Sequence, residues 1–483
     1  MSPAFSSPSR ARVSRNSAMT RRSPASHFFG TALLATLGLL AGCGSPPKPV
    51  PPPVVVAPPV VVLPPKPIPP PENLPPVMLG IDVLEADGFK AIAGKKIGLL
   101  THPAGVNRRG ESTVDVLRRA PNAKLVALFS PEHGISGTDK AGDNVPDSMD
   151  QRTGLPVYSL YGKHNKPTAE QLKGLDALVI DLQDIGTRSY TFNVVMRYAM
   201  DSCFQYGVEV IVLDRPNPLG GLKVDGPSLD AEWMSGVGAF RVPYVHGLTM
   251  GELATMAKQA PHVLAITEKQ RAKGRLTVIP MRGWTRAMRW PETGLQWVPT
   301  SPFIQSYDAV IGYAMVGLGC QNSGWFSGIG RDFPFRGIGF PKKKPDEVIA
   351  ALDAYRIPGI RLVKRDGRDR DGKIVTGVYV EVSDWEAWHP TELSFYMHKQ
   401  AEKWSPLKVF AALSLADQRT FQIHVGSTAW FDALKRDGMR VDVAPFLKNW
   451  AERAAVYQQQ VKKYWLYPWA EITPAGAVPV ARK

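Results

Sequence analysis

The chain has 483 residues, enough for two or three domains, and 44% of them are hydrophobic, which is ordinary for a globular protein and excludes disorder throughout. The formal net charge is +15, but the basic residues are scattered and several lie near the N-terminus. The charge therefore favours contact with anionic envelope polymers or lipid over nucleic acid. Three cysteines are too few for a disulfide framework.

The N-terminus has the pattern of an export signal. Several arginines precede an apolar stretch at 28–40 that is too short to span a bilayer. The tetrad Leu-Ala-Gly-Cys at 40–43 follows, and it resembles the lipobox of bacterial lipoproteins, in which the precursor is cut before the cysteine and the cysteine is acylated. We therefore expect residues 1–42 to be a signal peptide and Cys43 to carry lipid; an ordinary signal peptide is the alternative. Gly44, not Asp, follows the cysteine, which predicts a lipid anchor in the outer membrane of a bacterial cell envelope, on the periplasmic side.

Residues 43–77 alternate proline clusters with runs of valine. Proline fixes φ and lacks an N–H donor, so this segment is predicted to be a semi-rigid polyproline II linker that rises about 3.1 Å per residue. About thirty residues at that rise would hold the next domain up to ~90 Å from its lipid.

Strand and helix patterns alternate beyond the linker. Strands are predicted at 96–100, 125–129, 177–182 and 208–213, and helices at 112–119 and 190–206. This alternation predicts an α/β fold, with a Rossmann-like doubly wound parallel sheet at 78–300 and a smaller C-terminal α/β domain at 301–483. No GxGxxG motif follows any of these strands, so we expect no dinucleotide and propose no other cofactor.

Polar residues follow each of the four predicted strands. The sequences there are THPAG (101–105), PEHG (131–134), DLQDIGTR (181–188) and DRPNPLGG (214–221). The carboxyl ends of parallel strands share one edge of a sheet, where ligands bind in open α/β folds. Each sequence alone is a weak signal, because polar turns after strands are common. Together they predict a site in which carboxylates, arginines, an asparagine and imidazoles converge.

Several longer motifs carry a family resemblance. PEHG, DLQDIGTRSYT (181–191), DRPNPLGG with VDGP (224–227), and HGLTMGEL (246–253) resemble the family first named domain of unknown function 1343. That family contains exo-acting β-N-acetylmuramidases of the NamZ type, which are glycoside hydrolases. The resemblance reaches YWLYP at 464–468. It implies a cleft between a Rossmann-like and a smaller α/β domain, and release of N-acetylmuramic acid from the non-reducing ends of peptidoglycan fragments.

One region departs from the family pattern. Members usually carry an asparagine after a Ser-Pro pair and, later, an acidic, glycine-rich loop. Here Phe303 follows the Ser-Pro, and the sequence at 319–325 is GCQNSGW, without the carboxylates of that loop. Substrate contacts from this side are therefore expected to differ.

The C-terminal half is predicted to form its own elements. Thr249 and Glu252 have capping-box spacing, 276–279 reads as a strand and 307–316 as a buried helix. Two further strands, at 360–363 and 374–382, flank a polar connection. Its alternating aspartates and arginines lack the spacing of a calcium loop, so no metal site is proposed.

Glycoside cleavage needs an acid to protonate the leaving oxygen and a second group to act as nucleophile or to activate water. Glu132 is the candidate acid, because burial beside apolar residues favours the protonated form of a carboxyl group. His133, next to it, is a further candidate catalytic residue. Asp184 is the candidate second catalytic group. Asp214 and the substrate's own acetamide are alternatives for that role.

Arginines after the strands suit the carboxylate of N-acetylmuramic acid. Its lactyl carboxylate pairs with guanidinium in bidentate fashion. Hydroxyls and the acetamide suit the remaining polar side chains. The predicted substrate-binding residues are Arg188, Tyr190, Asp214, Arg215, Asn217 and His246.

Two other functions remain possible at this point. A lipoprotein could hold peptidoglycan fragments in the same cleft without cleaving them, and the altered sequence at 319–325 is the main support for that reading. An esterase using Ser130 with His133 is the other alternative, which the absence of a GxSxG motif disfavours.

Overall fold

The computed structural model of the protein describes residues 76–140, 142–405 and 409–469. The predicted signal peptide, the lipidation site Cys43 and the linker as far as residue 75 lie outside the described residues. Val77, at the predicted end of the linker, is already fully buried, and Met78 pairs with Arg282 in an isolated antiparallel bridge. The last residues of the predicted linker therefore pack into the domain that follows.

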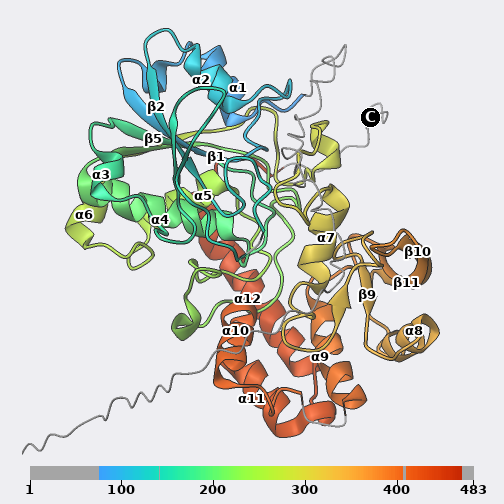
Figure 1. The fold of residues 1–483 in the computed structure, drawn as a ribbon. Coiled ribbons are helices and arrows are strands. Elements are labelled where there is room, and N and C mark those ends of the chain that lie inside the picture. Colours follow the sequence, from blue (N-terminus) through green and yellow to red (C-terminus); the bar gives the residue numbers. More distant parts are fainter. Residues whose placement is uncertain (1–75, 141, 406–408, 470–483) are drawn as a thin grey trace, which may run out of the picture. The chain divides into compact units, whose positions relative to one another are not determined.

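Seven strands of the described chain form the first sheet (Figure 1). They are β1 (Lys96–Thr101), β2 (Lys124–Ser130), β3 (Ser148–Met149), β4 (Pro156–Ser159), β5 (Ala177–Asp181), β6 (Glu209–Leu213) and β7 (Leu276–Ile279). Their order is β3-β4-β2-β1-β5-β6-β7, and every pair is parallel except β3 with β4. Numbered along the chain, the parallel strands follow the Rossmann order, whose switch point lies here between β1 and β5. The predicted parallel, doubly wound sheet is confirmed.

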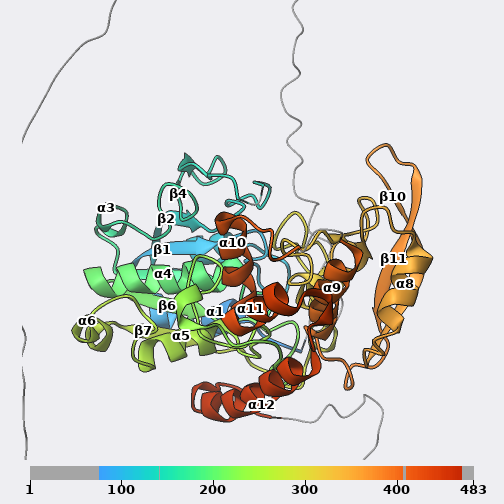
Figure 2. The ribbon, with the colours of Figure 1, turned by 90° about the horizontal axis from the view of Figure 1, so that it is seen from below.

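Successive residues of the central strands point to opposite faces of the sheet. Ile97 and Leu99 pack with α1 (Gly80–Ala86) and α2 (Thr113–Arg118), whereas Leu178 and Ile180 pack with α4 (Thr191–Tyr206) and α5 (Met250–Gln259). Figure 2 shows α4 and α5 along one face of the sheet. Both faces are thus covered, which explains the uninterrupted apolar runs of these strands.

Local sequence explains the ends of the helices beside the sheet. Gly207 closes α4 with φ of 78°, a conformation that suits glycine. Thr249 caps α5 and forms the predicted capping box with Glu252. Two shorter helices, α3 (Ala169–Leu172) and α6 (Glu268–Lys273), complete this part.

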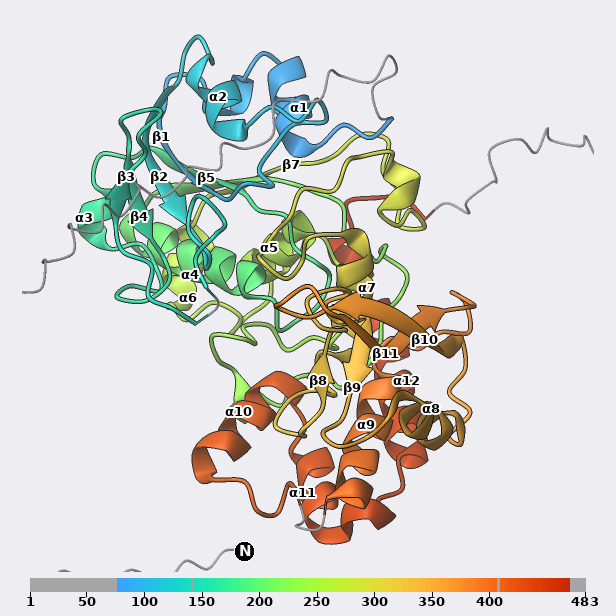
Figure 3. The same ribbon diagram turned by 45° about the vertical axis from the view of Figure 1, so that its right-hand side comes forward.

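A second, antiparallel sheet follows in the order β10-β11-β9-β8. Its strands are β8 (Phe326–Ser327), β9 (Gly337–Gly339), β10 (Ile360–Arg368) and β11 (Ile374–Val382). Helix α8 (Pro345–Asp353) packs beside β10 and β11 (Figure 3), and α7 (Tyr307–Val316) precedes the sheet. The predicted smaller α/β part is therefore present.

The hairpin connection is shorter than predicted. The prediction ended the first strand at residue 363, but β10 continues to Arg368, which pairs with Ile374. Only residues 369–373 form the turn, in which the Asp369 carboxylate accepts from the backbone N–H of Asp371 and Lys373 at 2.9 Å. Strand pairing thus extends through charged residues, because an exposed strand does not need apolar side chains.

Helices complete the C-terminal part. They are α9 (Glu392–Trp404), α10 (Leu415–Val425), α11 (Thr428–Asp437) and α12 (Ala444–Val461). Short 3₁₀ turns occur throughout the described chain, at Lys90–Ile92, Ala231–Trp233, Pro291–Thr293, Gly438–Arg440 and Lys462–Tyr464. Buried Phe395 and Trp430 belong to the same apolar core as Phe192 of α4. The core therefore continues across residue 300, and the predicted domain boundary there stays a prediction. None of the helices that the structure describes is both long enough and apolar enough to cross a bilayer.

Candidate active site

Loops after β2, β1, β5 and β6 lie along one edge of the first sheet, because these strands are adjacent and parallel. Two cavities lie at this edge. One, of about 340 Å³, contains Glu132, and the other, of about 120 Å³, contains Arg215. The sheet thus brings together the strand ends that the sequence singled out.

Glu132 follows β2 directly and both of its carboxylate oxygens are held. Thr191 Oγ1 donates to Glu132 Oε2 at 2.8 Å, and the backbone N–H of Gly142 donates to Oε1 at 3.0 Å. Thr191 is the first residue of α4, so the carboxylate lies at the N-terminus of that helix. Ile423 of α10 lines the same cavity, which therefore receives residues from both halves of the chain.

Tyr161 lies beside Glu132 in this cavity. Burial and, secondarily, the Glu132 carboxylate raise the pKa of Tyr161 to about 12. Its hydroxyl therefore keeps its proton at neutral pH and remains a hydrogen-bond donor. The sequence did not point to Tyr161, because the short strand β4 that precedes it was not predicted.

Asp184 and His246 form a second polar cluster. Asp184 accepts from the backbone N–H of Gly186 at 2.8 Å and from Asn193 Nδ2 at 3.3 Å. The backbone N–H of Leu248 donates to His246 Nδ1 at 3.2 Å, so a neutral imidazole carries its proton on Nε2, which lies 3.6 Å from Asp184 Oδ2. Both side chains are almost fully buried.

Hydroxyl groups fill the space near these carboxylates. Ser189 Oγ lies 3.0 Å from the Tyr244 hydroxyl and 3.1 Å from that of Tyr313. Burial raises the pKa of Tyr313, and the charges of Glu132 and Asp184 raise it further. Both candidate catalytic carboxylates thus lie near the same partly buried tyrosine of α7.

Tyr190 and His133 are placed by the loops themselves. The Tyr190 hydroxyl donates to Thr300 Oγ1 at 2.8 Å, and burial raises the Tyr190 pKa. His133 adopts a left-handed backbone, with φ of 73°, and its Nδ1 lies 2.7 Å from the carbonyl of Asp139, to which it donates. Its Nε2 is then the acceptor nitrogen of the neutral ring. No hydrogen bond joins Ser130 to His133 in the described chain, so the geometry gives no support to the esterase alternative.

His102 lies behind this cluster at the switch point. Its Nε2 accepts from the backbone N–H of Gln183 at 3.0 Å. Burial, together with the nearby Arg215 and His133, holds the His102 pKa well below its ordinary value. The ring is therefore neutral at pH 7, and its contacts fix the start of the loop that carries Asp184.

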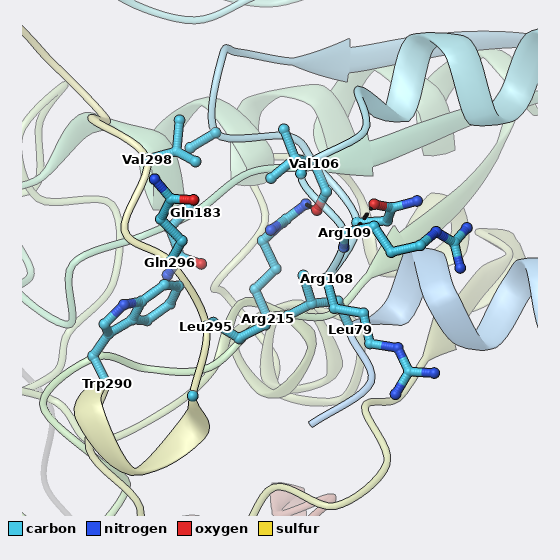
Figure 4. Close-up of a pocket in the computed structure, with 14 residues that line it drawn as sticks. Leu79, Val106, Arg108, Arg109, Gln183, Arg215, Trp290, Leu295, Gln296 and Val298 are labelled. Carbon is cyan, nitrogen blue, oxygen red and sulfur yellow. Dashed lines mark hydrogen bonds between the residues drawn. The ribbon is translucent and has the colours of Figure 1, made fainter. Parts of the chain in front are cut away.

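Arg215 lies in the second cavity and is paired within the protein (Figure 4). Its Nε lies 2.5 Å from Asp181 Oδ1, and its Nη2 donates to Asp181 Oδ2 at 2.9 Å and to the carbonyl of Val106 at 2.6 Å. Figure 4 shows Arg108 and Arg109 pointing away from it. Both groups of the Arg215–Asp181 pair are almost completely buried, so this guanidinium joins the ends of β5 and β6.

Two other predicted binding residues, Arg188 and Asp214, also have partners within the protein. Arg188 is fully buried and donates to the carbonyl of Val425 at 3.0 Å. Asp214 is completely buried and accepts from Thr249 Oγ1 and from the backbone N–H of Gly251, each at 2.7 Å. Burial raises the pKa of Asp214 to about 6. These contacts support structural roles, and the predicted contacts of Arg188 and Asp214 with substrate remain predictions.

Asn217 connects two loops of the site. Its Nδ2 donates to the carbonyl of Leu248 at 3.0 Å, and its Oδ1 accepts from the backbone N–H of Leu219 at 3.0 Å. Gly186 packs against it with φ of 80°, and an added Cβ there would come within 2.3 Å of Asn217 Oδ1. Asn217 therefore joins the loop that carries Asp184 to the loop that carries His246, and it does not line the Glu132 cavity.

The segment that departs from the family pattern packs against α9. The backbone N–H of Gly319 donates to Ser394 Oγ, and Trp325 Nε1 donates to the carbonyl of Met397, both at 2.8 Å. Residues 319–325 do not line the Glu132 cavity as the structure describes it. The altered sequence therefore gives no geometric support to the binding-only alternative.

No group of three or more His, Cys, Asp or Glu side chains in residues 76–140, 142–405 and 409–469 is placed to hold a metal ion.

Known proteins resemble this chain in sequence and in fold. Residues 97–308 match the family model described as exo-beta-N-acetylmuramidase NamZ, N-terminal, and residues 311–467 match its C-terminal counterpart. A peptidoglycan beta-N-acetylmuramidase NamZ of Bacillus subtilis (strain 168) is 43% identical over 284 residues. The match covers 59% of this chain and 66% of that protein, just under two thirds of its length.

Two solved structures are also similar, both crystal structures of DUF1343 family proteins from Bacteroides fragilis NCTC 9343. The first has a TM-score of 0.73 at 33% identity and covers 82% of this chain and 100% of the other. The second has a TM-score of 0.61 at 27% identity and covers 82% and 99% of the two chains. The two family models together span most of the chain, and the solved structures share its fold. The chain therefore belongs to the exo-beta-N-acetylmuramidase NamZ family.

Proposed function

We propose that the protein is an exo-β-N-acetylmuramidase that releases N-acetylmuramic acid from the non-reducing ends of peptidoglycan fragments. The observation that carries the proposal is Glu132, a carboxylate held by Thr191 and Gly142 at the edge of a cavity large enough for a sugar residue. Family membership and the Bacillus relative, whose name states this activity, support the same reaction.

In the proposed reaction Glu132 donates its proton to the oxygen of the leaving sugar. The carboxylate is partly exposed to the cavity, so a glycosidic oxygen can approach it, and its contacts with Thr191 and Gly142 limit its rotation. A fixed acid needs no reorientation in the transition state, which is the source of its advantage over water.

Asp184 is the proposed second catalytic group. Hydrogen bonds from Gly186 and Asn193 fix its orientation, and Nε2 of His246 lies 3.6 Å away. In this position Asp184 activates a water molecule or orients the acetamide of the substrate for attack on the anomeric carbon. The buried hydroxyls of Ser189, Tyr190 and Tyr313 suit the hydroxyl groups of the terminal sugar.

Recognition of the lactyl carboxylate is assigned to Arg215 rather than Arg188, because Arg215 lines the smaller cavity and Arg188 lines neither. Arg188 is fully buried, its Nη2 donates to two backbone carbonyls, and its Nε and Nη1 have no hydrogen-bond partner among the described residues. Arg215 uses Nε and Nη2 for its described partners, so among the described residues Nη1 has no hydrogen-bond partner. One N–H group facing a cavity would give a single contact rather than the bidentate pair expected from the sequence.

The activity is tested with the disaccharide of N-acetylmuramic acid linked to N-acetylglucosamine. The purified protein should release free N-acetylmuramic acid, detected by chromatography, and should leave the matching disaccharide of N-acetylglucosamine nearly uncleaved. The reversed disaccharide, with N-acetylmuramic acid at the reducing end, is the control for exo action. Comparable rates on both terminal sugars would contradict recognition of the lactyl group. Binding without any turnover would favour the binding-only alternative.

We also propose that the mature protein is a lipoprotein tethered to a bacterial membrane through Cys43, most simply the outer membrane. The lipobox-like tetrad at 40–43 supports this location. Radiolabelled palmitate should enter the wild-type protein and not the Cys43→Ala variant. Equal labelling of both proteins would remove the lipoprotein proposal.

A further inference from the structure

A third cavity adjoins the one that contains Glu132. It has a volume of about 520 Å³ and is lined by residues 163–169 and by the second half of α4. Asn165 and Tyr198 line both cavities, so the two lie side by side along α4, and together they are called the groove. The α-helix rises 1.5 Å per residue, which places Asp201 about 15 Å along the axis from Thr191. The groove is therefore long enough to follow a chain of sugars away from Glu132.

The far part of the groove carries an excess of positive charge. Lys163, Lys166 and Arg197 line it, against a single carboxylate, that of Asp201. Asp201 is buried, lies 3.7 Å from Arg197 and accepts from the backbone N–H of Ala265 at 2.8 Å. The Asp201 carboxylate therefore mainly neutralises the charge of Arg197 and offsets only part of the positive potential of Lys163 and Lys166.

Lys163 and Lys166 are exposed, and neither forms a salt bridge with another residue that the structure describes. His164, between them, also lines the groove. Two ammonium groups without a described ion-pair partner lie on either side of Asn165, where the groove continues from the cavity of a candidate catalytic carboxylate, and they indicate a site for a negative charge.

We propose that Lys163 and Lys166 bind a carboxylate on the part of the peptidoglycan fragment that leaves. The proposal rests on the proposed function, because it takes Glu132 as the point of cleavage. The cavity that contains Glu132 then receives the terminal sugar, and the open part of the groove along α4 receives the rest of the chain.

Two groups in such fragments supply that carboxylate. A second N-acetylmuramic acid without a peptide carries a free lactyl carboxylate. When a stem peptide is attached there, that carboxylate becomes an amide and the peptide's own carboxylates replace it. The disaccharide used to test the activity has neither group beyond the cleaved bond, so it separates this site from the catalytic one.

The test measures binding by calorimetry in the Glu132→Gln background, which prevents turnover. The variant Lys163→Glu/Lys166→Glu should bind a tetrasaccharide with N-acetylmuramic acid at its first and third positions roughly 3- to 30-fold more weakly, as expected for losing and reversing two exposed ion pairs. Binding of the disaccharide should stay unchanged. The difference should shrink at high salt, because exposed charges are screened.

A matched control replaces two exposed lysines at the opposite, amino end of the strands. Lys96 and Lys124 are register partners at the starts of β1 and β2, so Lys96→Glu/Lys124→Glu makes the same change in net charge away from the groove. If this control also binds the tetrasaccharide more weakly, the effect comes from the net charge of the protein, and the proposal is overturned.

The tetrasaccharide is used with and without a stem peptide on its third sugar. An effect only without the peptide assigns the site to the lactyl carboxylate, and an effect only with it assigns the site to peptide carboxylates. Equal weakening of the disaccharide and of both tetrasaccharides, or no weakening at all, would overturn the proposal. Kinetic measurements on the enzyme with Glu132 intact separate this proposal from the proposed function. If that enzyme cleaves the disaccharide but the lysine changes have no effect on binding, the proposed function stands and the lysine site does not. If the lysine changes weaken tetrasaccharide binding but no substrate is cleaved, only the lysine site stands.

Discussion

The hydrogen bond between Thr191 and Glu132 gives the sharpest prediction about catalysis. Thr191→Val replaces the hydroxyl with a methyl group of similar size, so Oε2 of Glu132 loses the donor that now lies 2.8 Å away. The backbone N–H of Gly142 would still hold Oε1 at 3.0 Å. The carboxylate would therefore remain in the cavity but with greater freedom to rotate.

The expected loss follows from the strength of such a bond. A hydrogen bond to a charged group contributes about 1.5–3 kcal/mol. If that contribution is realised only when Glu132 is correctly oriented in the transition state, kcat should fall roughly 10- to 100-fold while KM changes little. The assay is steady-state release of N-acetylmuramic acid from its disaccharide with N-acetylglucosamine.

Thr255→Val is the matched control. Thr255 lies in α5, and its hydroxyl donates to the carbonyl of Gly251 at 2.8 Å, away from the Glu132 cavity. The control should keep wild-type kcat, and both variants should keep similar melting temperatures. A kcat within about twofold of wild type in Thr191→Val, or an equal fall in both variants, would refute the positioning role.

Two further predictions concern stability. His398 is fully buried, Trp430 Nε1 donates to its Nδ1 at 3.1 Å, and burial lowers its pKa from 6.5 to about 4. The neutral ring should therefore contribute its full stability above pH 6.5, and the free energy of unfolding should fall by up to ~3 kcal/mol as the pH drops from 6.5 through 4. His398→Gln should flatten that part of the melting-temperature profile, and an unchanged slope would contradict the assignment. Arg286 Nη1 lies 2.6 Å from Oε1 of the completely buried Glu252. Arg286→Met should leave that buried carboxylate unpaired and lower the free energy of unfolding, measured by chemical denaturation, by about 3–5 kcal/mol. A loss below about 1 kcal/mol would contradict the role of this ion pair.

Sequence patterns predicted the architecture well where apolar residues formed clear runs and where a glycine or a polar turn marked the end of an element. The apolar runs of β1, β2, β5 and β6 and the glycine that ends α4 are local signals, and they place the strand ends at one edge without further information. Strand β4 spans only Pro156–Ser159 and escaped prediction, so Tyr161 beyond it was missed as a neighbour of Glu132.

Side-chain partners were harder to predict because they depend on contacts distant in the chain. Arg215 pairs with Asp181, and Arg188 donates to carbonyls more than 200 residues away, contacts that local sequence does not reveal. Thr191 belongs to the motif DLQDIGTRSYT, but only the three-dimensional structure shows that its hydroxyl donates a hydrogen bond to Glu132. The motifs thus located the site, whereas the fold separates residues that face the cavity from residues that support it.

Glu132→Gln on two substrates with different leaving groups tests the central claim most directly. General acid catalysis typically contributes about 10²–10⁴-fold, so kcat/KM on the natural disaccharide should fall by at least that much. An aryl muramide with a very acidic phenol needs little protonation, so its loss should be much smaller. Unchanged activity on the disaccharide would contradict the assignment of Glu132 as the acid, and an equal loss on both substrates would move Glu132 to binding or to nucleophilic attack.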